Sequence, residues 1–135
     1  MTSPEDVALA LRGPILVVGA GLIGASVGKA LVAAGADVHL WDIDRGNALV
    51  AAGRGAGQLD GLDDDAYRVV VVATPPSAVA STIVERLNRH PHAVVTDTAS
   101  VKGAVLAELI DLAAGRDVDV TRYVGSHPMA GTQYT

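Results

Sequence analysis

The sequence predicts an α/β fold in which a doubly wound, mainly parallel sheet carries helices on both faces. Short apolar runs alternate with helical patterns along the chain, which is typical of this class. The unbroken run Val69–Val72 suits a strand that is buried on both faces. In addition, polar motifs follow directly after the predicted strands, and the carboxyl ends of parallel strands form the edge where such sheets bind ligands.

The first strand is expected at residues 14–18 and the first helix at residues 22–34. Gly35 should end this helix, because glycine readily adopts the left-handed conformation of the residue after a helix. The apolar stripe that the helix turns toward the sheet is expected to consist of Ile23, Val27, Ala30 and Leu31.

The remaining elements follow at similar intervals. A second strand at 37–41 leads into a short helix that ends near residue 52, and residues 58–62 are so polar that any third strand there must be short. Pro75 and Pro76 should stop the next strand, since proline cannot donate to a strand ladder. The later elements are expected as a strand at 67–73, a helix at 77–88, a strand at 93–96, a helix at 101–114 and a last strand at 122–125.

A glycine-rich turn, Gly19-Ala20-Gly21-Leu22-Ile23-Gly24, separates the first strand from the first helix. In that context it predicts a dinucleotide-binding turn of the Rossmann type, with these six residues as cofactor contacts. Gly19 permits the tight turn, Gly21 lets the backbone approach a pyrophosphate, and Gly24 lets the helix pack on the strand. The alternative is a purely structural turn, against which the flanking elements and the acidic residue described next both argue.

Asp42 ends the second apolar run, about 18 residues beyond Gly24, close to the spacing of the acidic residue that binds the adenosine ribose. Its carboxylate would repel a 2′-phosphate, so NAD is expected rather than NADP. Arg45 is a further candidate cofactor contact, because it could accept a phosphate or stack on the adenine. Asp42 or Asp44 could instead cap the helix that begins near Arg45, and Asp44 is better placed for that role.

Size and charge limit the possible function classes. The 135 residues make one domain, 1–135, and 10 basic against 15 acidic residues give a formal charge of -5. No cluster of lysine or arginine indicates a nucleic-acid partner. No apolar run approaches the ~18 residues of a membrane span, and the start of the chain is polar, so we expect a cytoplasmic protein without a membrane partner.

Cysteine and histidine content restricts the chemistry further. The chain has no cysteine, which removes disulfides and thiolate nucleophiles from consideration. The four histidines lack the spacing of metal ligands, so no metal site is expected. His39 in a strand, and His90 and His92 in a loop, are expected to have structural roles.

Four motifs together resemble those of the prephenate dehydrogenases, including the members that use arogenate. They are Gly19–Ser26, Ala73–Pro76, Asp97–Lys102 and Gly125–Thr132. The ordered pair Asp-x-x-Ser-x-Lys and His-Pro-Met-Ala-Gly is close to diagnostic. The resemblance implies an enzyme that oxidises the ring hydroxyl of prephenate with a nicotinamide cofactor. Loss of the ring carboxylate as CO2 then gives 4-hydroxyphenylpyruvate, on the route to tyrosine.

The resemblance also implies the catalytic residues. His127 would hydrogen-bond the ring hydroxyl and take its proton, which is reasonable because an unperturbed imidazole titrates near pH 6.5. Ser100 would contact both the hydroxyl region and this histidine, although it is also suited to cap the helix beginning near Val101, and both roles can hold together. Asp97 is expected to make hydrogen bonds at the end of its strand rather than to act as a general base.

Further contacts follow from the same resemblance. Thr74 and Pro75 would border the nicotinamide half of the cofactor. Thr132 would help to hold the substrate together with its neighbour Gln133. Many family members carry an acidic residue at the position of Gln133, and glutamine keeps hydrogen-bonding capacity without the charge.

Family members continue into a mainly helical second domain, which provides homodimer contacts and an arginine for the substrate carboxylates. The chain is therefore expected to be a fragment, the nucleotide-binding half, which binds NAD but turns over prephenate poorly by itself. Prephenate and arogenate remain open as substrates. A different NAD-dependent enzyme of the β-hydroxyacid or imine reductase type, and a non-catalytic NAD-sensing module, remain as alternatives.

Overall fold

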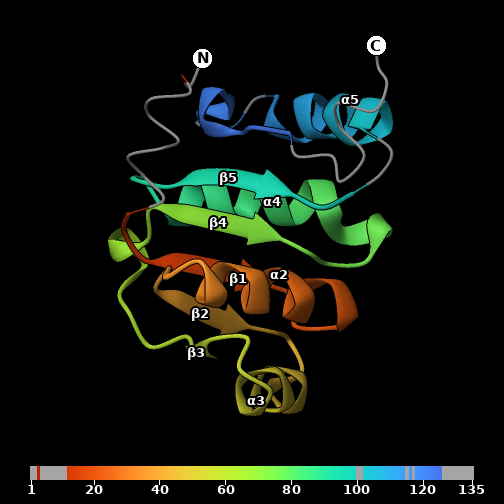
Figure 1. The fold of residues 1–135 in the computed structure, drawn as a ribbon. Coiled ribbons are helices and arrows are strands. Elements are labelled where there is room, and N and C mark those ends of the chain that lie inside the picture. The colour runs from red at the N-terminus through yellow and green to blue at the C-terminus, as the bar shows by residue number, and fades with distance from the viewer. Residues whose placement is uncertain (1–2, 4–11, 100–101, 115, 117, 126–135) are drawn as a thin grey trace.

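The computed structural model of the chain describes residues 3, 12–99, 102–114, 116 and 118–125. Within these residues five parallel strands form one sheet in the order β3-β2-β1-β4-β5, as Figure 1 shows from bottom to top. The strands are β1 (Ile15–Val18), β2 (Val38–Trp41), β3 (Gln58–Leu59), β4 (Val69–Val72) and β5 (Val94–Asp97). The predicted fold class, including the short third strand, is therefore confirmed.

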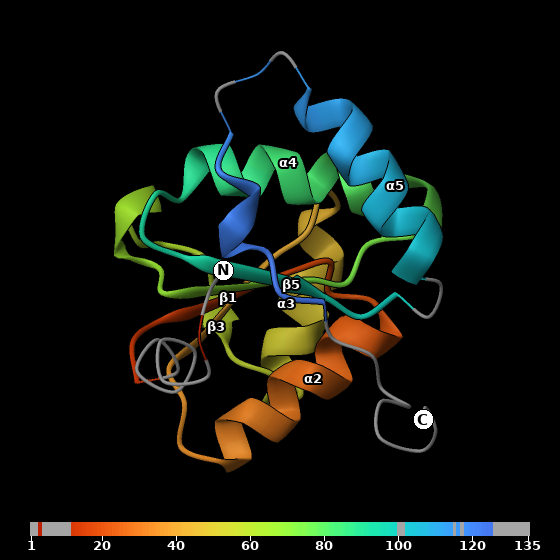
Figure 2. The same cartoon turned by 90° about the horizontal axis from the view of Figure 1, so that it is seen from above.

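Helices cover both faces of the sheet, as Figure 2 shows from above. One face carries α4 and α5, and the other carries α2 and α3. Their bounds are α2 (Leu22–Ala33), α3 (Arg45–Gly53), α4 (Val79–Arg89) and α5 (Lys102–Ala113), with short 3-10 turns at Asp64–Ala66, Pro76–Ala78 and Val120–Arg122. None of the helices in the described part of the chain is long and apolar enough to cross a membrane.

The central strands are apolar throughout because they serve two cores. In β1, Leu16 and Val18 belong to the core beneath α4 and α5, whereas Ile15 and Val17 belong to the core beneath α2 and α3. All four side chains are fully buried. Since successive residues of a strand point to opposite faces, a strand between two helical layers needs an apolar residue at every position.

The predicted apolar stripe of α2 is only half right. Val27 and Leu31 pack against the core, but Ile23 is 57% exposed and Ala30 is also exposed. The residues of α2 that are fully buried are glycines, Gly24 and Gly28. The helix approaches its neighbours so closely that glycine, rather than a large apolar residue, occupies the line of contact.

Local signals set the helix ends as expected. Gly35 follows α2 with a φ of +89°, in the left-handed region that favours glycine. Asp44 is the N-cap of α3, and its side chain accepts a hydrogen bond from the backbone N–H of Gly46 at 2.9 Å.

The expected last strand at 122–125 is wrong. A 3-10 turn occupies Val120–Arg122, held by the side chain of Asp119, which accepts from the backbone N–H of Thr121 at 3.0 Å. The segment that follows makes a single parallel bridge to the sheet, between Tyr123 and Val95. The apolar pattern of these residues therefore marks packing against the sheet edge rather than a strand.

Arg122 explains why this segment stays in place. Its guanidinium donates to three backbone carbonyl oxygens at the end of α4 and the start of β5. These are the oxygens of Leu87 at 2.5 Å, His90 at 2.8 Å and Ala93 at 2.7 Å. The last carbonyls of a helix have no partner within the helix, so a cation placed there both satisfies them and interacts favourably with the helix dipole.

We expect Arg122→Ala to lower the free energy of unfolding by about 2–4 kcal/mol, because several charged hydrogen bonds to partly buried carbonyls are lost together. Urea denaturation followed by circular dichroism measures the change. Arg54→Ala is the matched control, since the side chain of Arg54 lies exposed after α3. Equal losses in the two variants would contradict the capping role.

Two of the expected structural histidines are buried toward the amino ends of the strands. The ring Nδ1 of His90 donates to the carbonyl oxygen of Asp64 at 2.8 Å, and Arg86 Nη1 lies 3.2 Å from its Nε2. Burial lowers the pKa of His90, which keeps the ring neutral beside the arginine. His39 is also buried, and its Nε2 lies 3.0 Å from a carboxylate oxygen of Asp37.

Candidate functional site

The carboxyl ends of four strands lie side by side. Val18 pairs with Trp41 on one side and with Val72 on the other, and Val72 pairs with Asp97. The segments that follow these four residues therefore share one edge of the sheet. The prediction that the motifs gather at this edge is confirmed for those that begin at Gly19, Asp42, Thr74 and Asp97.

The glycine turn is shaped by two close backbone approaches. Gly19 has a φ of +101°, and a Cβ there would lie 2.6 Å from the carbonyl oxygen of Ala73. A Cβ on Gly24 would lie 1.7 Å from the carbonyl oxygen of Gly19. Both positions therefore require glycine, and the turn holds the start of α2 tightly against the sheet.

Gly21 differs from its two neighbours because a Cβ there would meet nothing within 4 Å. It is the N-cap of α2, and no side chain caps this end of the helix. The first turn of α2, which begins at Leu22, also carries no acidic residue. A helix start with open space before it and free N–H groups suits a bound anion such as a pyrophosphate.

Asp42 connects the second strand to this turn. Its Oδ2 accepts from the backbone N–H of Ala20 at 2.7 Å, and its Oδ1 accepts from the backbone N–H of Asp44 at 2.8 Å. Asp44 caps α3, so the two aspartates have separate tasks. Arg45 is the exposed first residue of α3 and lines a shallow hollow of about 260 Å³ together with Asp42.

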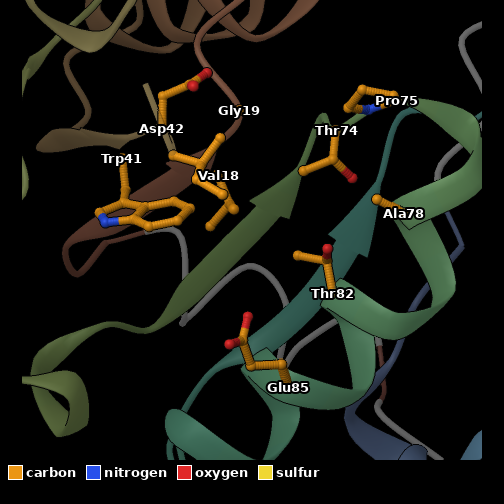
Figure 3. A pocket seen from close by; sticks show the side chains of 10 residues that line it. Val18, Gly19, Trp41, Asp42, Thr74, Pro75, Ala78, Thr82 and Glu85 are labelled. Carbon is orange, nitrogen blue, oxygen red and sulfur yellow. The ribbon is translucent and has the colours of Figure 1, made fainter. Parts of the chain in front are cut away.

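A cavity of about 430 Å³ opens beside Asp42. Figure 3 shows Trp41 and Asp42 on one side of it and Thr74, Thr82 and Glu85 on the other. Pro75 also lines this cavity, as does Gly19. Sequence reasoning missed Trp41, Thr82 and Glu85. The available signals were the adjacency of the sole tryptophan to Asp42 and the spacing of Thr82 and Glu85 on one helix face.

Trp41 is held in place from the core side. The guanidinium carbon of Arg86 lies 4.9 Å from the centroid of the indole ring, which is a cation–π contact. Arg86 is 1% exposed, and its burial lowers the pKa of its guanidinium. This contact restrains one wall of the cavity.

A second cavity of about 410 Å³ lies on the other side of Thr74, which lines both. Ile23, Thr98, Ala99 and Glu108 contribute to its walls. The Oγ1 atom of Thr74 is buried and has no hydrogen-bond partner among the described residues. The first cavity therefore lies toward the end of β2 and the second toward the end of β5, with Thr74 between them.

Asp97 makes the strand-end hydrogen bonds that were expected of it. It is fully buried, and its Oδ2 accepts from the backbone N–H of Ala99 at 3.0 Å. Its Oδ1 accepts from the hydroxyl of Tyr123 at 2.7 Å. Burial raises the pKa of the Tyr123 hydroxyl, and the hydrogen bond to Asp97 raises it further.

The remaining expected site residues lie outside the described residues. They are Ser100, His127, Thr132 and Gln133. Their predicted roles therefore rest on the sequence.

Comparisons with known proteins agree on one family. The sequence profile of the family described as "Prephenate dehydrogenase, nucleotide-binding domain" matches residues 27–135. A protein of Streptomyces niveus, "Probable prephenate dehydrogenase NovF", is 33% identical over 116 residues. The match covers 86% of this chain and 31% of that protein, so the chain spans about a third of the curated relative.

Solved structures give the same result. Synechocystis arogenate dehydrogenase is 28% identical with a TM-score of 0.69, over 90% of this chain and 42% of that one. A candidate prephenate dehydrogenase of Corynebacterium glutamicum is 32% identical with a TM-score of 0.66, over 90% of this chain and 38% of that one. An imine reductase of Myxococcus stipitatus, at 20% identity and a TM-score of 0.63, shares the fold.

Proposed function

Because the chain belongs to the prephenate dehydrogenase family, as its nucleotide-binding domain, we propose that it supplies the NAD-binding half of a prephenate dehydrogenase. The observation that carries this proposal is the bond between Asp42 and the backbone N–H of Ala20. It supports the proposal because the carboxylate that would bind the ribose lies directly beside the turn that would receive a pyrophosphate. Arogenate is the alternative substrate.

The described residues fit a dinucleotide. Its pyrophosphate would lie before the start of α2, where Gly21 leaves space and the helix dipole attracts negative charge. Its adenine would enter the cavity between Trp41 and Thr82, and Arg45 would border that end. The nicotinamide would lie in the second cavity, on the far side of Thr74.

Asp42 supports NAD over NADP. Two backbone N–H groups hold its carboxylate in a defined orientation, and the remaining lone pairs can accept from the ribose hydroxyls. An ionised carboxylate has no donor for a 2′-phosphate and repels its charge. The preference for NAD over NADP can be measured by tryptophan fluorescence, because the sole tryptophan lines the proposed adenine cavity.

In the proposed reaction, the bound nicotinamide supplies a hydride acceptor. His127 accepts the proton of the substrate ring hydroxyl, and Ser100 orients that hydroxyl by a hydrogen bond. The C–H bond at the hydroxyl-bearing ring carbon breaks with loss of hydride to the cofactor, and the C–O bond gains double-bond character. The bond to the ring carboxylate then breaks, its electron pair enters the ring to give the aromatic phenolate, and CO2 leaves. His127 returns the proton to the phenolate oxygen. Thr132 and Gln133 hold the substrate. The products are 4-hydroxyphenylpyruvate, CO2 and the reduced cofactor, which places the reaction in tyrosine biosynthesis.

The rest of the enzyme is part of the same proposal. Since the relatives are more than twice as long as the region they share with this chain, we place the substrate clamp and the homodimer contacts in a further domain. Catalysis needs the substrate held in near-attack geometry from both sides. We propose that the enzyme acts on its small-molecule substrate in the cytoplasm.

The cofactor preference provides the first test. Titration followed by Trp41 fluorescence should show NAD binding at least 10-fold more tightly than NADP. We expect Asp42→Asn to weaken NAD binding by about 10–100-fold, as for a lost charged hydrogen bond. The difference in affinity between NAD and NADP should become smaller. Asp65→Asn, at an exposed residue between β3 and β4, is the control. A parent chain that binds NADP as tightly as NAD would refute the assignment of Asp42.

A further inference from the structure

The hydrogen bond between Tyr123 and Asp97 joins two segments that are far apart in the sequence. Asp97 is the last residue of β5, whereas Tyr123 follows the 3-10 turn Val120–Arg122. Near this bond the backbone adds a bridge between Val95 and Tyr123, and the N–H of Val124 donates to the carbonyl oxygen of Val95 at 2.9 Å. Arg122 holds this segment against the end of α4, whereas the bond between Tyr123 and Asp97 ties it to the carboxyl end of β5.

The burial of Asp97 explains why the hydroxyl of Tyr123 is needed at this position. Asp97 is 0% exposed, and a buried carboxylate needs donors for its oxygens. Ala99 provides one of these donors from the turn after β5, and Tyr123 provides another from the opposite segment. Burial and the hydrogen bond to Asp97 raise the pKa of Tyr123, which favours the protonated, donating form of its hydroxyl.

Both segments continue directly into residues of the proposed reaction. Ser100 is the third residue after Asp97, and His127 is the fourth residue after Tyr123. A misplacement of about 1 Å can reduce turnover by about 100-fold, even when the substitution lies away from the reacting atoms. The place where the two segments are tied is therefore expected to affect how Ser100 and His127 meet the substrate.

We propose that Tyr123 is a positioning residue, whose hydroxyl sets the register between the segment leading to Ser100 and the segment leading to His127. The proposal rests on the function proposed above. Tyr123 acts through Asp97 and the two segments and does not itself touch the reacting atoms.

Tyr67 offers a matched control. Its side chain is fully buried, and its hydroxyl also donates to a carboxylate, that of Asp60. It packs edge-on against His39 and His90, near the amino ends of the strands. Tyr67→Phe and Tyr123→Phe therefore delete the same atom from the same kind of contact, but at opposite ends of the sheet.

The test compares the two variants in the enzyme that includes the further domain. We expect Tyr123→Phe to lower kcat for prephenate by 10- to 100-fold, with the Kd for NAD changed less than twofold. Tyr67→Phe should leave kcat within twofold of the parent. Unchanged kcat in Tyr123→Phe would overturn the proposal, as would equal losses of kcat in both variants, because the effect would then follow stability alone.

A second measurement does not depend on turnover. In the 135-residue chain, the ring Cε1–H resonance of His127 can be followed by NMR and assigned with His127→Asn. We expect Tyr123→Phe to shift this resonance and its titration midpoint, and Tyr67→Phe to leave both unchanged. If the parent enzyme oxidises neither prephenate nor arogenate, the proposed function fails. A shift of the His127 resonance in Tyr123→Phe would still support the positioning role of Tyr123, and an unchanged resonance would still refute it.

Discussion

Replacing Gly24 by alanine is expected to destabilise the domain by roughly 3 kcal/mol or more, at the upper end of what overpacking costs. The added Cβ would lie 1.7 Å from the carbonyl oxygen of Gly19, and the atom in its way belongs to the backbone. No side-chain rotation can relieve this contact, so α2 must move away from the sheet. Thermal unfolding should show a decrease in Tm of about 10 °C or more.

Gly21→Ala separates folding from binding at the same turn. A Cβ on Gly21 would meet nothing within 4 Å, and its φ of -74° is open to any residue, so the Tm should stay within a few degrees of the parent. The methyl group would instead occupy the space proposed for the pyrophosphate and weaken NAD binding. A Gly24→Ala variant with the same Tm as the parent would contradict the close approach between Gly24 and the carbonyl oxygen of Gly19.

Replacing His127 by asparagine is expected to lower kcat by a factor on the order of 10²–10⁴, the usual contribution of a positioned general base. Asparagine can still donate a hydrogen bond to the substrate, but it cannot take up the proton of the ring hydroxyl. NAD binding should not change. The assay follows reduced cofactor at 340 nm in the enzyme with its further domain, with prephenate and arogenate in parallel.

The outcome distinguishes the functions under consideration. His92→Asn, at an exposed histidine, controls for the loss of an imidazole as such. Loss of turnover with NAD binding intact supports the dehydrogenase assignment, and the ratio of the two substrate rates identifies the substrate. Full activity in His127→Asn would exclude the histidine as the proton acceptor. NAD binding without oxidation of either substrate by the parent would favour a sensing module.

Much of the fold was predictable because it depends on local patterns. An unbroken valine run such as Val69–Val72 suits only a strand between two helical layers, and Gly35 and Asp44 act through the chain immediately beside them. The binding edge was predictable for a related reason. Once the strands are known to be parallel, every segment that follows a strand must emerge on the same side of the sheet.

The errors arose where distant parts of the chain meet. The buried line of α2 consists of Gly24 and Gly28, because the distance between the helix and the backbone beneath it leaves no room for a side chain. Nothing in the sequence around the helix states that distance. Likewise, the segment at 122–125 resembled a strand, but Arg122 holds it against the end of α4, about 35 residues earlier in the chain.

The sequence by itself determined the fold class, the glycine-rich turn and the family, because periodicity and the order of the motifs depend only on positions along the chain. Only the tertiary structure decided which side chains face one another across the edge of the sheet. Trp41 and Glu85 share a cavity, and Tyr123 bonds to Asp97, although more than twenty residues separate the members of each pair. Such contacts depend on how the elements pack in three dimensions, which no local pattern specifies.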